Sequence, residues 1–154
     1  INWINPNSTE EFCIHLDGNQ HWFSTYEEKL QRWPLDKSVH FNAVPFATND
    51  FFHDQIGSIV ENLWLGSDGF AVFVERSNPL FLSRDTSSNK ALLCFSADYH
   101  ESPYNEAIDT KETNLNVHLI SGNDIKNVYQ YAAKLWIKKP IGIPDERMFK
   151  SPVW

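Results

Sequence analysis

The chain has 154 residues and a formal net charge of −7, and 42% of its residues are hydrophobic against 21% charged. That composition is typical of a folded globular protein of one domain and not of a disordered chain. The acidic balance disfavours nucleic acid and anionic lipid as partners, and no apolar run approaches the roughly 20 residues of a membrane-spanning helix.

The first part of the chain carries little regular pattern. Residues 1–20 are polar and rich in turn-forming side chains around a short apolar patch at Phe12 to Leu16. Residues 38–50 are predicted to form an irregular loop that contains the run Pro45-Phe46-Ala47-Thr48-Asn49-Asp50. A strand pattern is expected only from Ile56 onward.

Short apolar or alternating segments then follow at near-regular spacing. The predicted strands are 59–65, 70–75, 80–83, 91–99 and 114–121. Ser67-Asp68-Gly69 is a predicted hairpin turn, because Asp-Gly supplies the positive φ that such turns need. Residues 85–89 form a second polar turn. Short strands separated by such turns predict a mainly β protein, an antiparallel β-sandwich.

A single helix is predicted over 124–138, between a cap at Gly122-Asn123-Asp124 and a stop at Pro140. Its apolar face comprises Ile125, Val128, Ala132, Leu135 and Trp136. Residues 140–154 are expected to be an extended linker, and its apolar end, Val153-Trp154, indicates a chain that continues. Ile1, in place of an initiator Met, indicates a processed start. We therefore divide the chain into a β-sandwich domain, 1–121, and a helix with linker, 122–154.

Motifs that carry chemistry are absent from the sequence. It has no Gly-rich phosphate loop, no Gly-x-Ser-x-Gly elbow and no His-Glu-x-x-His. Cys13 and His15 lack a second pair that would complete a tetrahedral zinc site. We therefore predict no metal, no cofactor and no catalysis by this chain alone. Aromatic residues reach 14%, and such rings can form a core, an interface or platforms that stack on sugars.

Two cysteines, Cys13 and Cys94, lie far apart in the sequence. We predict that they are joined in a disulfide between strands, as a secretory compartment permits; the alternative is two buried free thiols. Asn7-Ser8-Thr9 is a glycosylation sequon, with Asn7 as the acceptor. Both features favour the secretory pathway, with the chain lumenal or extracellular.

A set of segments in fixed order resembles the N-terminal region of glycoside hydrolase family 31, close to its α-galactosidase-like members. The resemblance is carried by His21-Trp22-Phe23 with Glu27, Gln31-Arg32-Trp33-Pro34, Pro45 to Asp50, Glu61 to Leu65, Gly69 to Val72, Asn78 to Leu82, Tyr99 to Tyr104, and a tail from Lys139-Pro140 through Ile143 to Phe149 and Ser151 to Trp154. It spans roughly residues 13–154. One departure is Ser24-Thr25-Tyr26-Glu27, where relatives usually carry Gly-Gly-Ala-Glu.

The resemblance implies a β-sandwich that precedes a (β/α)8 barrel. The barrel supplies two Asp residues for retaining hydrolysis of an α-linked sugar, and both lie beyond this chain. The loop containing Thr48-Asn49-Asp50 would reach over the barrel mouth. Asp50 is then the candidate hydroxyl-binding carboxylate, with Asn49 and Trp22 as further substrate contacts. A turn-forming role for Asp50 is the alternative.

Two functions follow from this resemblance. The first is a non-catalytic N-terminal part of a retaining α-glycosidase, whose partner is the barrel of the same protein. The second is a carbohydrate-binding or structural sandwich of a catalytically inactive glycosidase-like protein. Two barrel carboxylates at retaining distance would decide for the first. The sequence leaves open whether the protein forms a homodimer.

Overall fold

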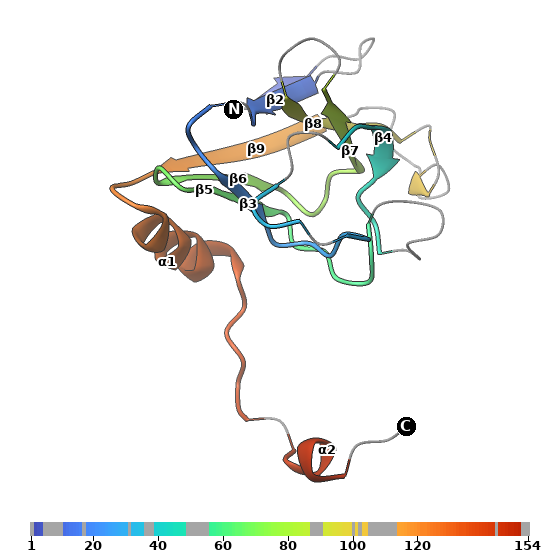
Figure 1. The fold of residues 1–154 in the computed structure, drawn as a ribbon. Helices are drawn as coiled ribbons and strands as arrows, with labels where there is room; N and C mark the ends of the chain where they lie inside the picture. Colours follow the sequence, from blue (N-terminus) through green and yellow to red (C-terminus); the bar gives the residue numbers. More distant parts are fainter. Residues whose placement is uncertain are drawn as a thin grey trace.

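The structure is a computed structural model that describes residues 2–4, 11–16, 18–30, 32–35, 39–48, 56–86, 91–99, 101, 103–104, 114–143 and 145–151. These residues form two antiparallel sheets packed as a sandwich, with a helix on the outside of one of them (Figure 1). The predicted mainly β sandwich is therefore confirmed. None of the helices in the described ranges is long and apolar enough to cross a membrane.

The larger sheet has the order β1-β9-β6-β5-β3, with the bounds Asn2–Ile4, Asn114–Ser121, Phe70–Val74, Leu63–Gly66 and Trp22–Ser24. The smaller sheet has the order β2-β8-β7-β4, with the bounds Glu11–His15, Leu92–Ala97, Leu80–Asp85 and Phe41–Pro45. Each pairing is antiparallel. Gly69, at φ 82°, makes the predicted turn between β5 and β6.

Side chains from the two facing sheet surfaces fill the main core. Trp64 of β5 is fully buried and packs edge-to-face on Phe95 of β8, with ring centroids 4.6 Å apart. Val72 and Val74 of β6 belong to the same buried cluster. The large aromatic content of the chain is thus partly explained by the core, where such rings bury much apolar area.

The outer face of the larger sheet is buried as well, beneath helix α1, Ile125–Trp136. Val128 and Ala132 of the helix pack on this face, and Trp136 stacks on Phe73 of β6 with centroids 4.2 Å apart. The Asp124 carboxylate accepts a hydrogen bond from the Asn127 amide, which confirms the predicted cap. Because both faces of β5 and β6 are covered, the sequences of these strands are continuous apolar runs.

Strands in the first part of the chain are the main difference from the sequence-based prediction. Residues 38–50 do not form an irregular loop throughout, because β4 spans Phe41–Pro45 and pairs with β7. The register shifts between Phe41 and Val44, and β4 is an edge strand, where Pro45 is tolerated. At this irregularity the side chains of β4 do not alternate between buried and exposed. The sequence therefore lacks the alternating pattern that predicts a strand, and Pro45 further disfavours one.

Beyond α1, the chain extends away from the sandwich (Figure 1). Its side chains are exposed, with Ile141 96% and Ile143 91% accessible. Within the described part of the predicted linker, 140–143 and 145–151, a short helix, α2, spans Arg147–Lys150. An ion pair of 2.7 Å between Glu146 and Lys150 supports that helical turn.

Candidate functional site

Three of the sequence-predicted site residues lie outside the described part of the chain. These are Asn49 and Asp50, the candidate sugar contacts, and Asn7, the glycosylation acceptor. Their roles stay predictions. The structure does describe the residues that flank the 49–55 segment, and these show how its ends are held.

Both flanks of the 49–55 segment are anchored in the core. On the N-terminal side, Phe46 is buried, and its amide donates to the Leu80 carbonyl at 2.8 Å. On the C-terminal side, Ile56 is completely buried and forms an antiparallel bridge with Glu28. The described residues on each side of this segment are therefore fixed by packing and by backbone hydrogen bonds.

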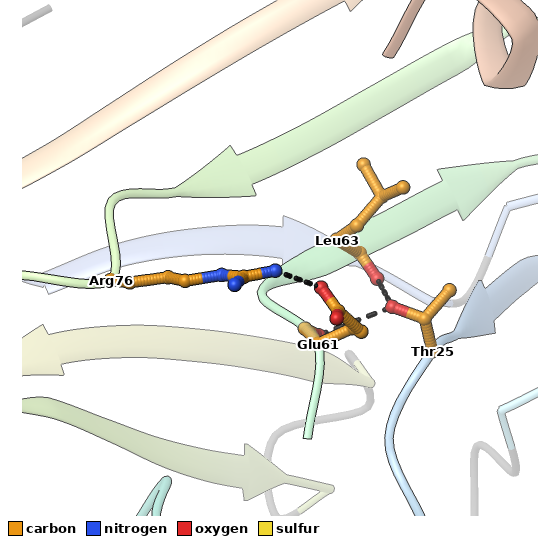
Figure 2. Close-up of polar contacts among 4 residues, drawn as sticks. All are labelled: Thr25, Glu61, Leu63 and Arg76. Atoms are coloured by element: carbon orange, nitrogen blue, oxygen red, sulfur yellow. Dashed lines mark hydrogen bonds and ion pairs between the residues drawn. The ribbon is translucent and has the colours of Figure 1, made fainter. Parts of the chain in front are cut away.

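In the segment Ser24-Thr25-Tyr26-Glu27, the structure shows what each of the last three side chains contacts. Thr25 donates its hydroxyl between the carbonyls of Leu63 at 2.7 Å and Glu61 at 3.1 Å (Figure 2). The Glu27 carboxylate accepts the Ser58 amide at 2.9 Å. Tyr26 is buried and directs its ring into the core, against Phe46 and Trp64. The tyrosine added at this position thus fills the sandwich interior.

A charged cluster lies in the same interior, and we name it the Arg84 cluster after its residues Tyr26, Glu28 and Arg84. Arg84 Nη2 donates to Glu28 Oε1 at 2.7 Å and to the Tyr26 hydroxyl at 3.2 Å. The Tyr26 hydroxyl donates to the same Glu28 oxygen at 2.6 Å. Burial, reinforced by the negative charge of Glu28, raises the pKa of Tyr26 well above its usual range, so this hydroxyl stays protonated and a donor.

Sequence reasoning did not find the Arg84 cluster. The signal was nevertheless present in β7, where Leu80, Leu82 and Arg84 alternate with Phe81 and Ser83. The period of two places Arg84 on the same face as the two core leucines. An arginine on the inner face of a predicted strand demands a buried carboxylate, but the sequence does not say which one.

The remaining predicted substrate contact, Trp22, is only 7% exposed and belongs to the main core. It borders a cavity of about 380 Å³ together with Phe12, Gln20 and Phe70. Its indole nitrogen is buried and has no hydrogen-bond partner within the described ranges. Contact of Trp22 with a sugar stays a prediction, and the position of the ring shows that it also packs the sandwich.

An exposed aromatic groove lies between β3 and α1. Its volume is about 550 Å³, and Phe23, Trp33 and Tyr129 form its aromatic lining. Trp33 is 68% exposed and meets Phe23 edge-to-face, with centroids 5.3 Å apart. Exposed rings of this kind can stack on sugars. Because the Thr25 hydroxyl is engaged by two carbonyls, polar contacts in the groove would come from Lys126 and Tyr129.

Cys13 and Cys94 are joined in a disulfide between directly paired positions of β2 and β8. The alternative of two buried free thiols therefore does not hold in this structure. Glu11 lies beside them, so that its carboxylate and the two sulfurs lie within 4.8 Å of one another. Thiolates are the ligands that would hold a metal here, and both sulfurs are occupied by the disulfide.

Comparison with known proteins agrees with the family resemblance. A family model described as "Myogenesis-regulating glycosidase N-terminal domain" matches residues 7–135. The chain is 28% identical over 153 residues to "Myogenesis-regulating glycosidase" of Mus musculus, an alignment that covers 97% of this chain and 21% of that protein. The chain thus spans about a fifth of the length of this relative. The family match covers most of the sandwich and α1, and the chain accordingly belongs to the myogenesis-regulating glycosidase N-terminal domain family.

Proposed function

We propose that this chain is the non-catalytic N-terminal β-sandwich of a retaining α-glycosidase-like protein, and that it lends the 49–55 segment to the sugar site. The curated relative is named a glycosidase and is about five times longer than the matched region. A chain of that length has room for the barrel that the family resemblance implies. The sandwich would then support the barrel, and the two reacting carboxylates would come from the barrel.

The observation that carries the proposal is the anchoring of the 49–55 segment at Phe46 and Ile56. Binding groups act best when a rigid scaffold holds the loop that presents them. Here one flank is fixed by a buried phenylalanine and the other by a completely buried isoleucine with a bridge to Glu28. Asp50 would use this scaffold to accept hydrogen bonds from sugar hydroxyls, with Asn49 beside it.

In the proposed arrangement, residues 1–121 form the sandwich domain and residues 122–154 lead from it to the barrel. Helix α1 is the packed part of the second region, since Val128 and Ala132 are buried against β5 and β6. The exposed segment after α1 supplies the connection. The barrel of the same protein is therefore the proposed partner, and an α-linked sugar, such as an α-galactoside, the proposed substrate.

A secretory location is part of the proposal. Disulfides persist mainly in oxidising compartments, and the Cys13–Cys94 bond supports such a compartment for this domain. The sequon at Asn7 would carry a glycan there. Digestion of the secreted protein with a peptide:N-glycosidase, followed by mass measurement of the peptide containing Asn7, tests this part of the proposal.

The substitution Asp50→Asn in the full-length protein tests the sugar contact. It keeps the side-chain shape but replaces one acceptor with a donor and removes the charge. We expect kcat/KM for an aryl α-galactoside to fall about ten- to hundredfold, because a charge-assisted hydrogen bond is worth about 1.5–3 kcal/mol. The melting temperature should stay unchanged.

Asp68→Asn is the matched control, because Asp68 is an exposed aspartate in the β5–β6 turn. Unchanged cleavage in Asp50→Asn, together with a lower melting temperature, would make Asp50 a turn residue and end the site assignment. If the full-length protein binds the galactoside but does not cleave it, the alternative of a sandwich in an inactive glycosidase-like protein replaces the proposal.

A further inference from the structure

A carboxylate lies beside the disulfide on the outer face of the smaller sheet. Glu11 and Cys13 are two residues apart on β2 and therefore point to the same face, and Cys13 pairs with Cys94 of β8. The Glu11 carboxylate and the two sulfurs lie within 4.8 Å of one another. Ser83 of β7, the partner position of Cys94, donates its hydroxyl to Glu11 Oε1 at 3.2 Å. Three neighbouring strands thus bring these side chains together (Figure 1).

The disulfide does not account for the position of Glu11. A disulfide is uncharged and has no hydrogen to donate, so a carboxylate beside it gains no hydrogen bond from it. The same two sulfurs as thiolates, together with a carboxylate oxygen, are ligands that zinc takes in proteins. Because three anionic ligands repel one another unless a cation lies between them, the arrangement favours a bound metal once the cysteines are reduced.

The sheet holds the two sulfurs side by side whether or not they are bonded. The residues that flank the cysteines pair with each other across β2 and β8 and pack on the main core. Phe12 lies against Phe95, with ring centroids 5.9 Å apart, and Ile14 is paired with Leu93. On a tetrahedral zinc ion with bonds of about 2.0–2.3 Å, neighbouring ligand atoms are about 3.3–3.8 Å apart. Rotation of the two cysteine side chains about their Cα–Cβ bonds gives that separation without a change in the backbone.

Space for an ion is present in front of the sulfurs. Glu11, Ser83 and the two cysteines border a hollow of about 460 Å³ on the sheet surface. Cys13 is half-buried, whereas Cys94 is only 4% exposed, so an ion reaches the pair from the side of Cys13. A zinc ion held by three protein ligands keeps a fourth position for water, and the hollow supplies the room for that water.

We propose that Cys13, Cys94 and Glu11 bind one zinc ion when the cysteines are reduced, and that the metal and the disulfide exclude each other. Binding replaces the two thiol protons with the ion and releases them to solvent. Oxidation takes two electrons from the two thiolates, and the zinc leaves. A second disulfide accepts these electrons with two protons and becomes two thiols. Each chain carries free thiols when it is synthesised, so the zinc-binding form precedes the disulfide. The inference needs neither the barrel nor the 49–55 segment.

The test uses the full-length protein after reduction with a phosphine, which takes the oxygen of one water molecule and leaves two thiols. Zinc is titrated against a chromophoric chelator that competes for it. Cobalt is titrated in parallel, because cobalt bound to thiolates shows a sulfur-to-metal charge-transfer absorption. The oxidised protein and Cys13→Ser/Cys94→Ser, treated identically, account for zinc bound elsewhere. Glu101→Gln is the matched control for Glu11→Gln, since Glu101 is exposed and does not line the hollow.

We expect the reduced protein to bind one zinc ion more than either reference. Glu11→Gln should weaken this binding about tenfold or more, and Ser83→Ala about tenfold, because Ser83 orients the ligand carboxylate. Glu101→Gln should leave the affinity unchanged. Zinc should raise the melting temperature of the reduced protein and not that of the oxidised protein, because an ion that binds only one of the two forms stabilises only that form.

Equal zinc binding by the reduced and oxidised proteins would overturn the inference, and so would binding that survives the loss of both cysteines. If Glu11→Gln and Ser83→Ala bind zinc as tightly as the unmodified protein, Glu11 is not a ligand and the three-residue site fails. Should the protein unfold on reduction, the melting curve recorded with zinc decides. Recovery of the folded state with zinc supports the site, and a chain that stays unfolded in saturating zinc rules it out.

Discussion

The interior around Arg84 and the sheet face beneath α1 are both buried, but they are built from different chemistry. Beneath α1, Phe73 stacks on Trp136, and Val128 and Ala132 complete an apolar contact. Around Arg84, an ion pair and a tyrosine hydroxyl lie between the sheets. Apolar contact scales with area and tolerates exchange of side chains, whereas the charged contact has one arrangement. The two regions teach that burial alone does not reveal what a contact is for.

Glu28→Gln tests the charged region around Arg84 and should have the largest effect on stability. It leaves the Arg84 charge buried beside a neutral amide, and removing one member of a buried ion pair costs about 3–5 kcal/mol. Chemical denaturation of the purified protein should show that loss in the free energy of unfolding. A loss below about 1 kcal/mol would mean that water or another group reaches Arg84 and that the pair is not truly buried.

Phe73→Ala tests the apolar region. Phe73 is 7% exposed, and its truncation removes the stacking partner of Trp136 and leaves a cavity under α1. We expect a loss of about 3 kcal/mol, at the lower end for a buried aromatic, because α1 can settle toward the sheet. Phe73→Leu should recover most of it. Equal losses for alanine and leucine would show that ring stacking, and not area, holds the helix.

Thr25→Val gives the smallest expected effect and separates hydrogen bonding from packing. Valine keeps the shape of threonine but leaves the carbonyls of Glu61 and Leu63 without the hydroxyl donor (Figure 2). The expected loss is about 1 kcal/mol in a denaturation series. Thr25→Ser keeps the donor and should lose less. A loss in Thr25→Ser as large as that in Thr25→Val would show that the packing of the methyl group matters as much as the hydrogen bond.

Much of the fold followed from local pattern. The alternating and apolar runs from Ile59 onward, the Asp68-Gly69 turn and the Asp124 cap predicted the sandwich and its helix, because these signals depend on neighbours in sequence. The strand at Phe41–Pro45 did not follow, since its pairing to β7 is irregular and its sequence ends in proline. An edge strand of this kind is defined by its partner, which lies far along the chain.

The sequence by itself determined that the chain folds as a β-sandwich and resembles the N-terminal region of a glycosidase family, and it named Cys13 and Cys94 as a candidate pair. Only the tertiary structure decided that Glu28 is the partner of Arg84, that Tyr26 points into the core, and that Phe46 and Ile56 anchor the segment with Asp50. These contacts join residues separated by up to 58 positions. The period of two predicts which face of a strand a side chain occupies. Which residue it contacts there depends on how the two sheets pack against each other.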